Sequence, residues 1–321
     1  MSRKKYYRNV KINKKRGGYM IETIKIGTLK WHHILNPSEE DLKYLKDNFH
    51  FHPLDIEDCR TYNQRPKIDI YDDYYFLILH FPDFDKSDIF LQTKEVKIFW
   101  GEDYIITIGQ SHWIVTQMFK DALEQEARKE EFKVNSSDAL LYKILEKLMT
   151  KSLLMIRKVG SELEYISQEL FSKRAKKTIE QISVSRKNVI LLNTMFKPQL
   201  RLFSKFETGA IKGFAENMED YWGNILDYYQ KMWDMTEDYQ ELIEGLSKTF
   251  DSLQTNRINE IMKVLTMVSA ILLPLTFITG LYGMNLGLPF SNDPKAFWII
   301  IISMVVIVFL MISYFKKRKW M

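Results

Sequence analysis

Hydrophobic residues are distributed unevenly along this chain, and its last sixth differs from everything before it. Residues 264–283 form a stretch of twenty residues without a charge, and residues 296–315 form a second stretch of the same length. In a helix that rises about 1.5 Å per residue, each stretch covers about 30 Å, the thickness of the hydrocarbon core of a bilayer. Core helices of soluble proteins rarely run this long without a charged face. The pattern therefore predicts two membrane-spanning helices, over residues 264–285 and 296–315, with a loop at 286–295 between them.

The N-terminal part of the chain alternates between strand-like and helix-like patterns. A helix is expected over residues 37–49, because Ser38 is a suitable cap and Asp41 follows three residues later. A shorter helix is expected at Pro53–Cys59. Stretches rich in β-branched and aromatic residues predict strands at 19–26, 29–34, 67–71, 74–81, 89–100 and 103–109. Such a sheet needs helices on its faces, so residues 19–131 are predicted to form a cytoplasmic α+β domain with a mixed sheet.

Helical spacing takes over beyond Trp113. Pro198 is expected to kink or end one of the helices, and Gly209 and Gly213 mark a turn. Residues 132–214 are therefore assigned to a cytoplasmic helical region. The expected helices lie near residues 113–131, 137–172 and 174–206.

The longest predicted element follows this turn. From Ala215 to Gly283, apolar residues recur at helical spacing, and the first proline is Pro274. A single helix of about 69 residues would be roughly 100 Å long, so a stalk at residues 215–263 would continue directly into the first membrane span. One helix cannot bury all of these apolar residues, which implies bundling with copies of the same chain.

Charged flanks predict the orientation of the two spans. Lys263 precedes the first span, residues 316–319 are all basic, and Lys295 is the only basic residue of the loop. Positive residues mark the cytoplasmic side, so both termini of this multi-pass protein are expected in the cytoplasm, beneath the plasma (inner) membrane. Met1 begins a polar, basic stretch with no apolar run behind it, which argues against a signal peptide. The single cysteine, Cys59, suits a reducing compartment.

The net charge of +5 hides an acidic body between two basic ends. Residues 1–18 hold eight basic residues and no acid, and the tail at residues 316–321 holds four basic residues. These twelve leave 34 of the 46 basic residues against 41 acids, so residues 19–315 carry about −7. An acidic body attracts cations. The basic arm is expected to be a solvated tail rather than a segment that binds RNA or anionic lipid, and no nucleic-acid partner is predicted.

One face of the first span is unusually polar for a membrane helix. Residues spaced alternately three and four apart share this face, and four of the seven are Thr, Ser or Gly. Small and hydroxyl residues on one face either pack against a neighbouring helix or line a wet path, and the spacing alone leaves both interpretations open. The seven residues of this stripe are Asn259, Met262, Thr266, Ser269, Leu273, Thr276 and Gly280.

Two further features favour a pore. Met262 and Leu265 lie where the span meets the cytoplasm, and rings of such residues gate pores by dewetting. The stripe also carries no charge. Mg²⁺ dehydrates reluctantly, so a pore that passes it with its waters needs only hydroxyl and amide oxygens to bind those waters. A homo-oligomer with cyclic symmetry would repeat each side chain as a ring around the axis.

The outer end of the first span carries the motif Tyr282-Gly283-Met284-Asn285. A Gly-Met-Asn triplet in this position resembles the CorA family of divalent cation (magnesium/cobalt) transporters. The resemblance covers most of the chain from about residue 50 onward. Its further segments are residues 52–58, 64–67, 259–266, 274–278 and 315–320.

The resemblance implies a homopentameric channel with two transmembrane helices per subunit, in which the first spans line the pore. Asn285 would form the outer selectivity ring, and the Gly-Met pair before it would allow close backbone packing and support the turn. Met262 and Leu265 match the family's inner hydrophobic constriction, and Asn259 matches the polar ring below it.

The resemblance also implies a sensor of cytoplasmic Mg²⁺ between subunits. Three acids of the soluble domain match the family's acidic positions. Two more lie one turn either side of the facing stalk position, Asn224, where the family usually has an aspartate. A cation bound there would bridge like charges across an interface, and its loss would let the subunits repel. The predicted regulatory metal residues are Glu57, Asp58, Glu146, Asp220 and Asp227.

These observations predict a channel-type transporter that moves hydrated Mg²⁺, and also Co²⁺ or Ni²⁺, down its electrochemical gradient under control of cytoplasmic Mg²⁺. Asp293, the only acid of the loop, would attract cations to the outer mouth. The sequence has no phosphate loop, nucleophile motif or ATP-binding signature, so neither an enzyme nor a pump is predicted. No cofactor is expected, and Mg²⁺ enters as substrate and regulatory ion. The expected partners are divalent cations, membrane lipid and copies of the chain.

Two alternatives stay open. Zinc transporters of the same superfamily share the Gly-Met-Asn motif and the two-span plan, and the adjacent His32 and His33 are a potential zinc-binding pair. All six histidines lie in the soluble part of the chain, however, and not in the spans. A membrane-anchored coiled-coil scaffold without a pore would suit the long helix. It would need neither the polar stripe nor Asn285.

Overall fold

The structure, a computed structural model, describes two compact units of the chain. They comprise residues 1–246 and 247–321, and each is described by itself. The first unit holds the sheet, helices α1 to α5 and the start of α6, whereas the second holds the rest of α6 and α7. The described residues are 21–85, 87, 89–109, 112–127, 134–170, 175–284, 294–318 and 320.

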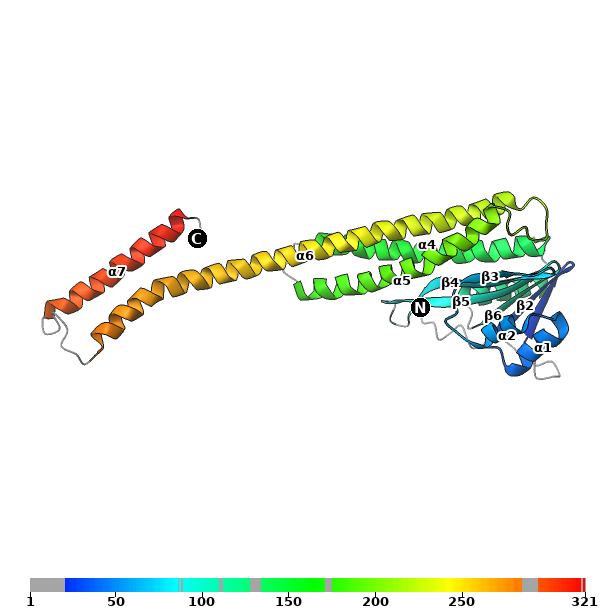
Figure 1. Cartoon of the computed structure of the whole chain (residues 1–321), viewed down its shortest axis with the longest axis horizontal. Helices are drawn as coiled ribbons and strands as arrows, with labels where there is room; N and C mark the ends of the chain where they lie inside the picture. Colours follow the sequence, from blue (N-terminus) through cyan, green and yellow to red (C-terminus); the bar gives the residue numbers. More distant parts are fainter. Residues whose placement is uncertain are drawn as a thin grey trace. The chain divides into compact units, whose positions relative to one another are not determined.

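The first unit is built around a six-stranded mixed sheet (Figure 1). Its strand order is β1-β2-β6-β5-β4-β3, and β2 and β6 are the parallel pair while the other neighbours are antiparallel. The predicted α+β fold with a mixed sheet is therefore confirmed. The strands are β1 (Ile21–Ile26), β2 (Leu29–Leu35), β3 (Lys67–Ile70), β4 (Tyr74–Phe84), β5 (Leu91–Gly101) and β6 (Tyr104–Gly109).

Two short helices, α1 (Glu39–Phe49) and α2 (Pro53–Arg60), cover one face of this sheet. The predicted cap of α1 is present, because the Asp41 amide donates to Ser38 Oγ over 3.2 Å and the Ser38 amide donates to Asp41 Oδ2 over 2.8 Å. This reciprocal pair satisfies two backbone donors that the first turn leaves free. The buried core between these helices and the sheet includes Leu42, Leu45, Ile56, Phe76 and Phe99.

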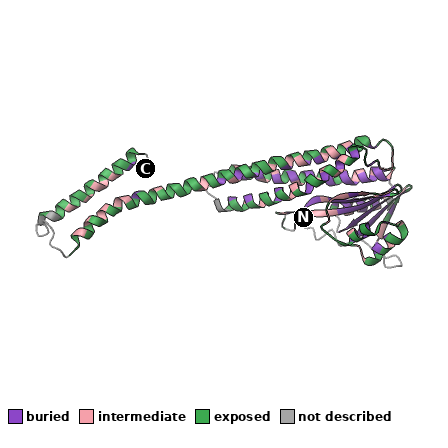
Figure 2. Ribbon diagram, in the orientation of Figure 1, coloured by how far each residue is buried: buried purple, intermediate pink, exposed green. Residues whose placement is uncertain are grey.

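Three longer helices cover the opposite face: α3 (Trp113–Ala127), α4 (Ser137–Glu169) and α5 (Ala175–Glu207). Trp31 on β2 is fully buried there and packs edge-on against Phe119 of α3, with ring centroids 5.1 Å apart. Figure 2 shows buried residues along most of the central strands. This is the pattern expected for a sheet covered on both faces.

Pro198 lies inside α5 and does not end it, because the helix continues to Glu207. The side chain of the next residue, Gln199, fixes this part of the helix to the sheet. The buried Gln199 amide accepts from the backbone N–H of His80 over 2.8 Å and donates to the carbonyl of the same residue over 2.9 Å. Such tertiary contacts offset the local cost of a proline inside a helix.

The turn after α5 contains the two expected glycines. Gly209 and Gly213 have φ values of +71° and +74°. A Cβ on Gly213 would lie 2.2 Å from Asp138 Oδ1, so a side chain does not fit there. The same carboxylate accepts from the Phe214 amide over 3.0 Å, which ties the start of α4 to the segment leading into α6.

Helix α6 (Glu219–Tyr282) is 64 residues long and confirms the prediction of one long helix. It begins four residues after the predicted start at Ala215. Asn217 has a φ of +62°, and this left-handed conformation cannot continue into a right-handed helix. The second apolar helix, α7 (Pro294–Lys317), extends slightly beyond its predicted ends.

Candidate functional site

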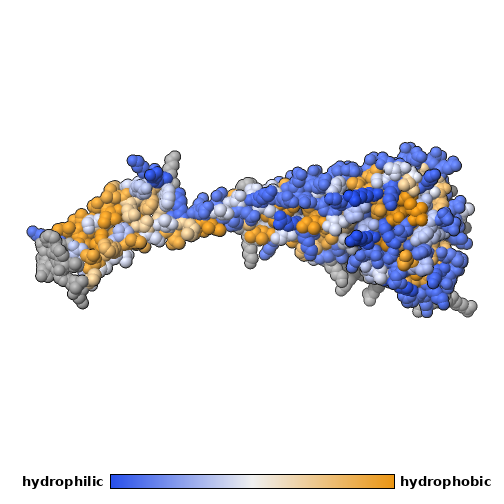
Figure 3. Space-filling view, viewed as in Figure 1, coloured by the Kyte–Doolittle hydropathy of each residue, from blue (hydrophilic) through white to orange (hydrophobic). Residues whose placement is uncertain are grey.

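The apolar parts of α6 and α7 are exposed. In the most apolar 18-residue stretch of each helix, only 6% of the stretch in α6 and 0% of the stretch in α7 is buried. Figure 3 shows the resulting hydrophobic surface over the C-terminal part of α6 and over α7. A core helix of a soluble protein would be covered by its own chain, and exposed apolar surfaces of this size mark contact with a membrane or with other chains.

The eight residues predicted to line a pore are all exposed on α6. Three of them are large and apolar, namely Met262 (53% exposed), Leu265 (57%) and Leu273 (72%). The other five are Asn259, Thr266, Ser269, Thr276 and Gly280.

The less exposed residues of the same helical segment lie on another side. At about 100° per residue, this side is centred roughly 140° around the helix from the predicted stripe. The stripe therefore lies within the sector of α6 that the described part of its own chain leaves open. The less exposed residues are Lys263, Met267, Ala270, Ile271, Pro274, Leu275, Ile278 and Leu281.

Two threonine hydroxyls of the stripe bind within their own helix. Thr266 Oγ1 donates to the carbonyl of Met262 over 2.8 Å, and Thr276 Oγ1 donates to the carbonyl of Leu272 over 2.9 Å. Each hydroxyl thereby uses its only proton, while its oxygen keeps a lone pair that can accept. The stripe consequently offers neutral hydrogen-bond acceptors, which suit the protons of water bound to a cation.

The predicted selectivity motif begins at the end of α6. Tyr282 is the last helical residue, and Gly283 and Met284 follow it on the surface. The Gly283 amide donates to the carbonyl of Thr279 over 2.9 Å, and a Cβ on this glycine would lie only 3.0 Å from that oxygen. A small residue therefore suits the position. Two predicted residues of this region lie outside the described part of the chain, Asn285 and Asp293.

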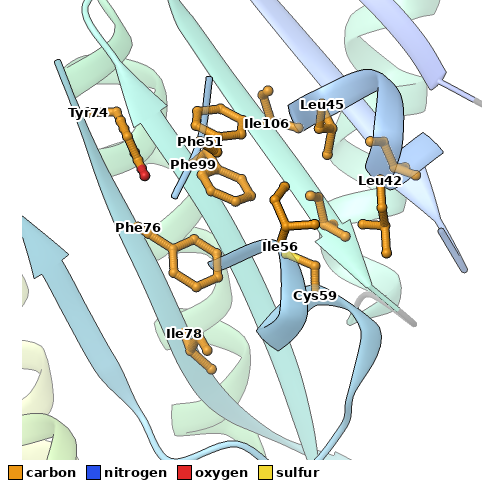
Figure 4. Packing of buried hydrophobic residues seen from close by; sticks show 12 residues of the cluster. Leu42, Leu45, Phe51, Ile56, Cys59, Tyr74, Phe76, Ile78, Phe99 and Ile106 are labelled. Carbon is orange, nitrogen blue, oxygen red and sulfur yellow. The ribbon is translucent and has the colours of Figure 1, made fainter. Parts of the chain in front are cut away.

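Two predicted sensor residues lie on α2, whose inner side is fixed by the core (Figure 4). Ile56 and Cys59 point toward the sheet, and both are buried. Between them along the chain, Glu57 is exposed and Asp58 is half-buried. Glu57 forms an ion pair with Arg60 one turn later. The acidic pair thus lies on the part of α2 that the core leaves accessible.

Asp58 is paired with a lysine of the same chain. Its Oδ2 lies 2.7 Å from Lys67 Nζ, which also binds Asp69 and lies 4.0 Å from Asp55 Oδ1. Burial disfavours the charged form of Lys67, but its hydrogen bonds to Asp58 and Asp69 outweigh burial and raise its pKa. The sequence interpretation included Lys67 only in a family motif and missed this contact. The spacing of two between Lys67 and Asp69 in a strand predicts only that these two share one face, and it gives no signal for the contact with Asp58.

The other predicted sensor residues lie on α4 and α6. The Tyr142 hydroxyl donates to Glu146 Oε1 over 3.4 Å and accepts from Asn224 Nδ2 over 2.7 Å, while Asp220 and Asp227 are exposed. Within the described residues of one chain, no group of three or more His, Cys, Asp or Glu side chains is placed to hold a metal ion.

The adjacent histidines are built into the sheet. The ring nitrogens of His33 lie 2.8 Å from Thr107 Oγ1 and 3.2 Å from Thr116 Oγ1, and His32 Nδ1 lies 2.8 Å from Thr23 Oγ1. Burial lowers the pKa of both rings to about 4. These contacts give both rings a structural role and do not favour a zinc site.

Comparison with known proteins agrees with this architecture. The family model described as CorA-like Mg²⁺ transporter protein matches residues 27–317. The cobalt/magnesium transport protein CorA of Thermotoga maritima is 26% identical over 280 residues, which are 85% of this chain and 78% of that protein. The putative metal ion transporter YfjQ of Bacillus subtilis is 27% identical over 303 residues, which are 94% of this chain and 93% of that protein. The complete structure of the CorA magnesium transporter from Methanocaldococcus jannaschii has a TM-score of 0.80 at 22% identity, over 93% of each chain.

The α+β domain is followed by two apolar segments long enough to cross a membrane, one at the end of α6 and one in α7, and this arrangement indicates a membrane protein. The family match covers nearly the whole chain, and the protein belongs to the CorA-like Mg²⁺ transporter family. The predicted family and fold class are thus confirmed. Because the members of this family are transporters, the prediction that the chain is not an enzyme is also confirmed.

Proposed function

We propose that this chain forms a homopentameric channel in the plasma membrane that passes hydrated Mg²⁺, and also Co²⁺ or Ni²⁺, down its electrochemical gradient. The observation that carries this proposal is the uncharged stripe on the open side of α6, in which four of the seven residues are Thr, Ser or Gly. The named relative that transports cobalt and magnesium supports the choice of ion.

The chemistry of the stripe suits an ion that keeps its waters. Mg²⁺ binds water tightly, so the surface it presents to a pore consists of water protons. A ring of Thr266 hydroxyls and a second ring of Thr276 hydroxyls would accept from these protons, since both hydroxyls already donate to their own helix. Stripping the waters instead would need carboxylate ligands, and residues 264–283 contain none.

The cytoplasmic end of the stripe would close the channel. Met262 and Leu265 repeat as apolar rings in a symmetric oligomer, and a narrow apolar ring excludes water and ions by dewetting. Asn259 would form a polar ring below them. At the other end, Asn285 would hold the waters of the entering ion and Asp293 would draw cations to the mouth.

The flanking charges set the proposed direction of the spans. Lys263 before the first span and Lys316 and Lys317 at the end of α7 support a cytoplasmic position of both termini. An inside-negative membrane potential then favours entry of a divalent cation by about 4.6 kcal/mol per 100 mV, twice the value for a single charge. The proposed transport therefore needs no ATP.

Cytoplasmic Mg²⁺ would close the channel through the acids on the soluble unit. Glu57 and Asp58 on α2 would share a cation with Glu146, Asp220 and Asp227 across the interface between neighbouring subunits. Loss of that cation would leave like charges opposed, which would loosen the closed assembly.

Flux into liposomes tests this function. Purified protein is reconstituted, an inside-negative potential is imposed, and uptake of Mg²⁺ is measured in competition with Co²⁺, Ni²⁺ and Zn²⁺, with protein-free liposomes as control. We expect Mg²⁺ uptake that Co²⁺ and Ni²⁺ reduce. Uptake of Zn²⁺ without Mg²⁺ would instead identify a zinc transporter, and an assembled oligomer that passes no cation would identify a scaffold.

A further inference from the structure

We propose that Lys67 is a tethered competitor of the divalent cation at Asp58, and that it thereby sets the cytoplasmic Mg²⁺ concentration at which the channel closes. The inference rests on the proposed role of Asp58 as a sensor residue. It assigns a regulatory role to a lysine in the loop-to-strand segment that follows α2.

The contact itself is the first observation. Lys67 Nζ lies 2.7 Å from Asp58 Oδ2, a hydrogen-bonded ion pair. A divalent cation that binds Asp58 has to share this oxygen with the ammonium or displace it. Mg²⁺ requires near-octahedral oxygen ligands at short distances, so an ammonium beside its carboxylate both repels the ion and occupies one side of the ligand.

The second observation is that both partners are held by the fold. The backbone carbonyl of Asp58 accepts from Lys97 Nζ over 2.7 Å, and Lys97 is only 1% exposed on β5. Lys67 begins β3, pairs with Ile78 of β4, and places its ammonium 5.3 Å from the centre of the Phe76 ring. Surface ion pairs contribute little when two freely moving side chains must be ordered. Because the fold already holds the backbone of both Asp58 and Lys67, less ordering is needed to form this pair.

The third observation is that Lys67 has other partners. It also binds Asp69 and lies 4.0 Å from Asp55 Oδ1, and its own side chain is 32% exposed. When a cation takes Asp58, the ammonium can remain on Asp69 and in contact with water. Displacement therefore does not leave a buried unpaired charge, which would otherwise make the exchange too costly.

The experiment measures the internal Mg²⁺ concentration that halves uptake into liposomes by the full chain. Lys67→Met and Lys67→Gln remove the charge, and we expect each to lower this concentration about two- to fivefold, the range of a partly exposed ion pair. Lys67→Arg keeps the charge and should stay near the wild type. The matched control is Lys30→Met, which removes another lysine of the same unit that pairs with Asp103 at 3.9 Å, and it should cause no shift.

Asp58→Asn completes a double-mutant cycle. Alone it should raise the half-inhibiting concentration, and in its background Lys67→Met should have no further effect. Thermal unfolding of each variant checks the fold, and Lys67→Gln serves if Lys67→Met is unstable.

Three results overturn the inference: an unchanged or raised half-inhibiting concentration in folded Lys67→Met or Lys67→Gln, an equal shift in Lys30→Met, or a full shift in the Asp58→Asn background. If Asp58→Asn alone changes nothing, the proposed sensor itself fails. If Asp58→Asn shifts inhibition and Lys67→Gln does not, only the role of Lys67 fails.

Discussion

Large apolar residues are buried in the first unit of this chain and exposed in the second. In the first unit, Trp31 and Phe99 are fully buried between the sheet and its helices. In the second, Leu273, Phe277 and Phe309 are 72%, 67% and 69% exposed. One chain therefore completes the fold of the first unit, whereas the apolar surface of the second is of the kind that a bilayer or further chains cover. The proposed transport is accordingly a property of an assembly, although the proposed sensor acids are displayed by a unit that folds around its own core.

The largest expected effect comes from the core of the first unit. Phe99 stacks on Phe51 and Phe76 with ring centroids 3.9 Å and 4.4 Å away. We expect Phe99→Ala to lower the free energy of unfolding of this unit by about 3–5 kcal/mol, because it removes buried area and leaves a cavity. Urea unfolding of the full chain in detergent, followed by tryptophan fluorescence, measures this.

The matched change in the second unit is Leu273→Ala. Because its side chain is exposed, it should alter the same unfolding free energy by no more than about 0.5 kcal/mol. If Leu273→Ala lowered this free energy of unfolding as much as Phe99→Ala, the first unit would not fold independently of the second.

Acid should destabilise the first unit, because this unit contains buried titratable groups. Burial lowers the pKa of His33 from 6.5 to about 4. Between these values the unfolded chain binds more protons than the folded one, so stability that is complete above pH 6.5 is lost as the pH falls toward 4. The slope from this residue should be about 1.4 kcal/mol per pH unit.

His33→Gln provides the test of that slope. The variant should be less stable at neutral pH, since it loses the contacts with Thr107 and Thr116, but its stability should fall less steeply on acidification. Urea unfolding at several pH values between 7 and 4 measures both curves. Parallel curves for the two proteins would show that His33 does not contribute.

A smaller effect is expected in the proposed pore. Thr276 lies on the stripe, whereas Thr279 lies about 100° around the same helix from the centre of the stripe, and both hydroxyls donate to backbone carbonyls. Thr276→Val should reduce Mg²⁺ uptake about fivefold, because it removes an acceptor worth about 1 kcal/mol. Thr279→Val should leave uptake within about twofold of the wild type. Equal effects would favour a packing role for the stripe.

Much of the fold was predictable because its signals are local. Alternation of β-branched and aromatic residues indicated the strands, and the spacing of Ser38 and Asp41 indicated the start of α1. The start of α6 was predicted too early, since nothing in the sequence shows that Asn217 adopts a left-handed conformation.

The candidate site was predictable only in part. The stripe on α6 follows from helical spacing, so its shared face could be predicted without a structure. The contact of Asp58 with Lys67 joins a helix to a strand, and that of Tyr142 with Asn224 joins residues 82 positions apart. Side-chain contacts between elements depend on packing, which local patterns do not encode.

Thiol blocking can show whether the stripe on α6 lines a pore. The native Cys59 provides a silent background, because it is 2% exposed and burial raises its pKa to about 12. Cysteine is placed on the stripe by Ser269→Cys and beside it by Val268→Cys, which is 48% exposed in the single chain. A membrane-impermeant methanethiosulfonate is then added during Mg²⁺ uptake into liposomes. We predict that the reagent blocks uptake through Ser269→Cys and spares Val268→Cys. Equal block of both, or block of Val268→Cys alone, would contradict a pore lined by this stripe.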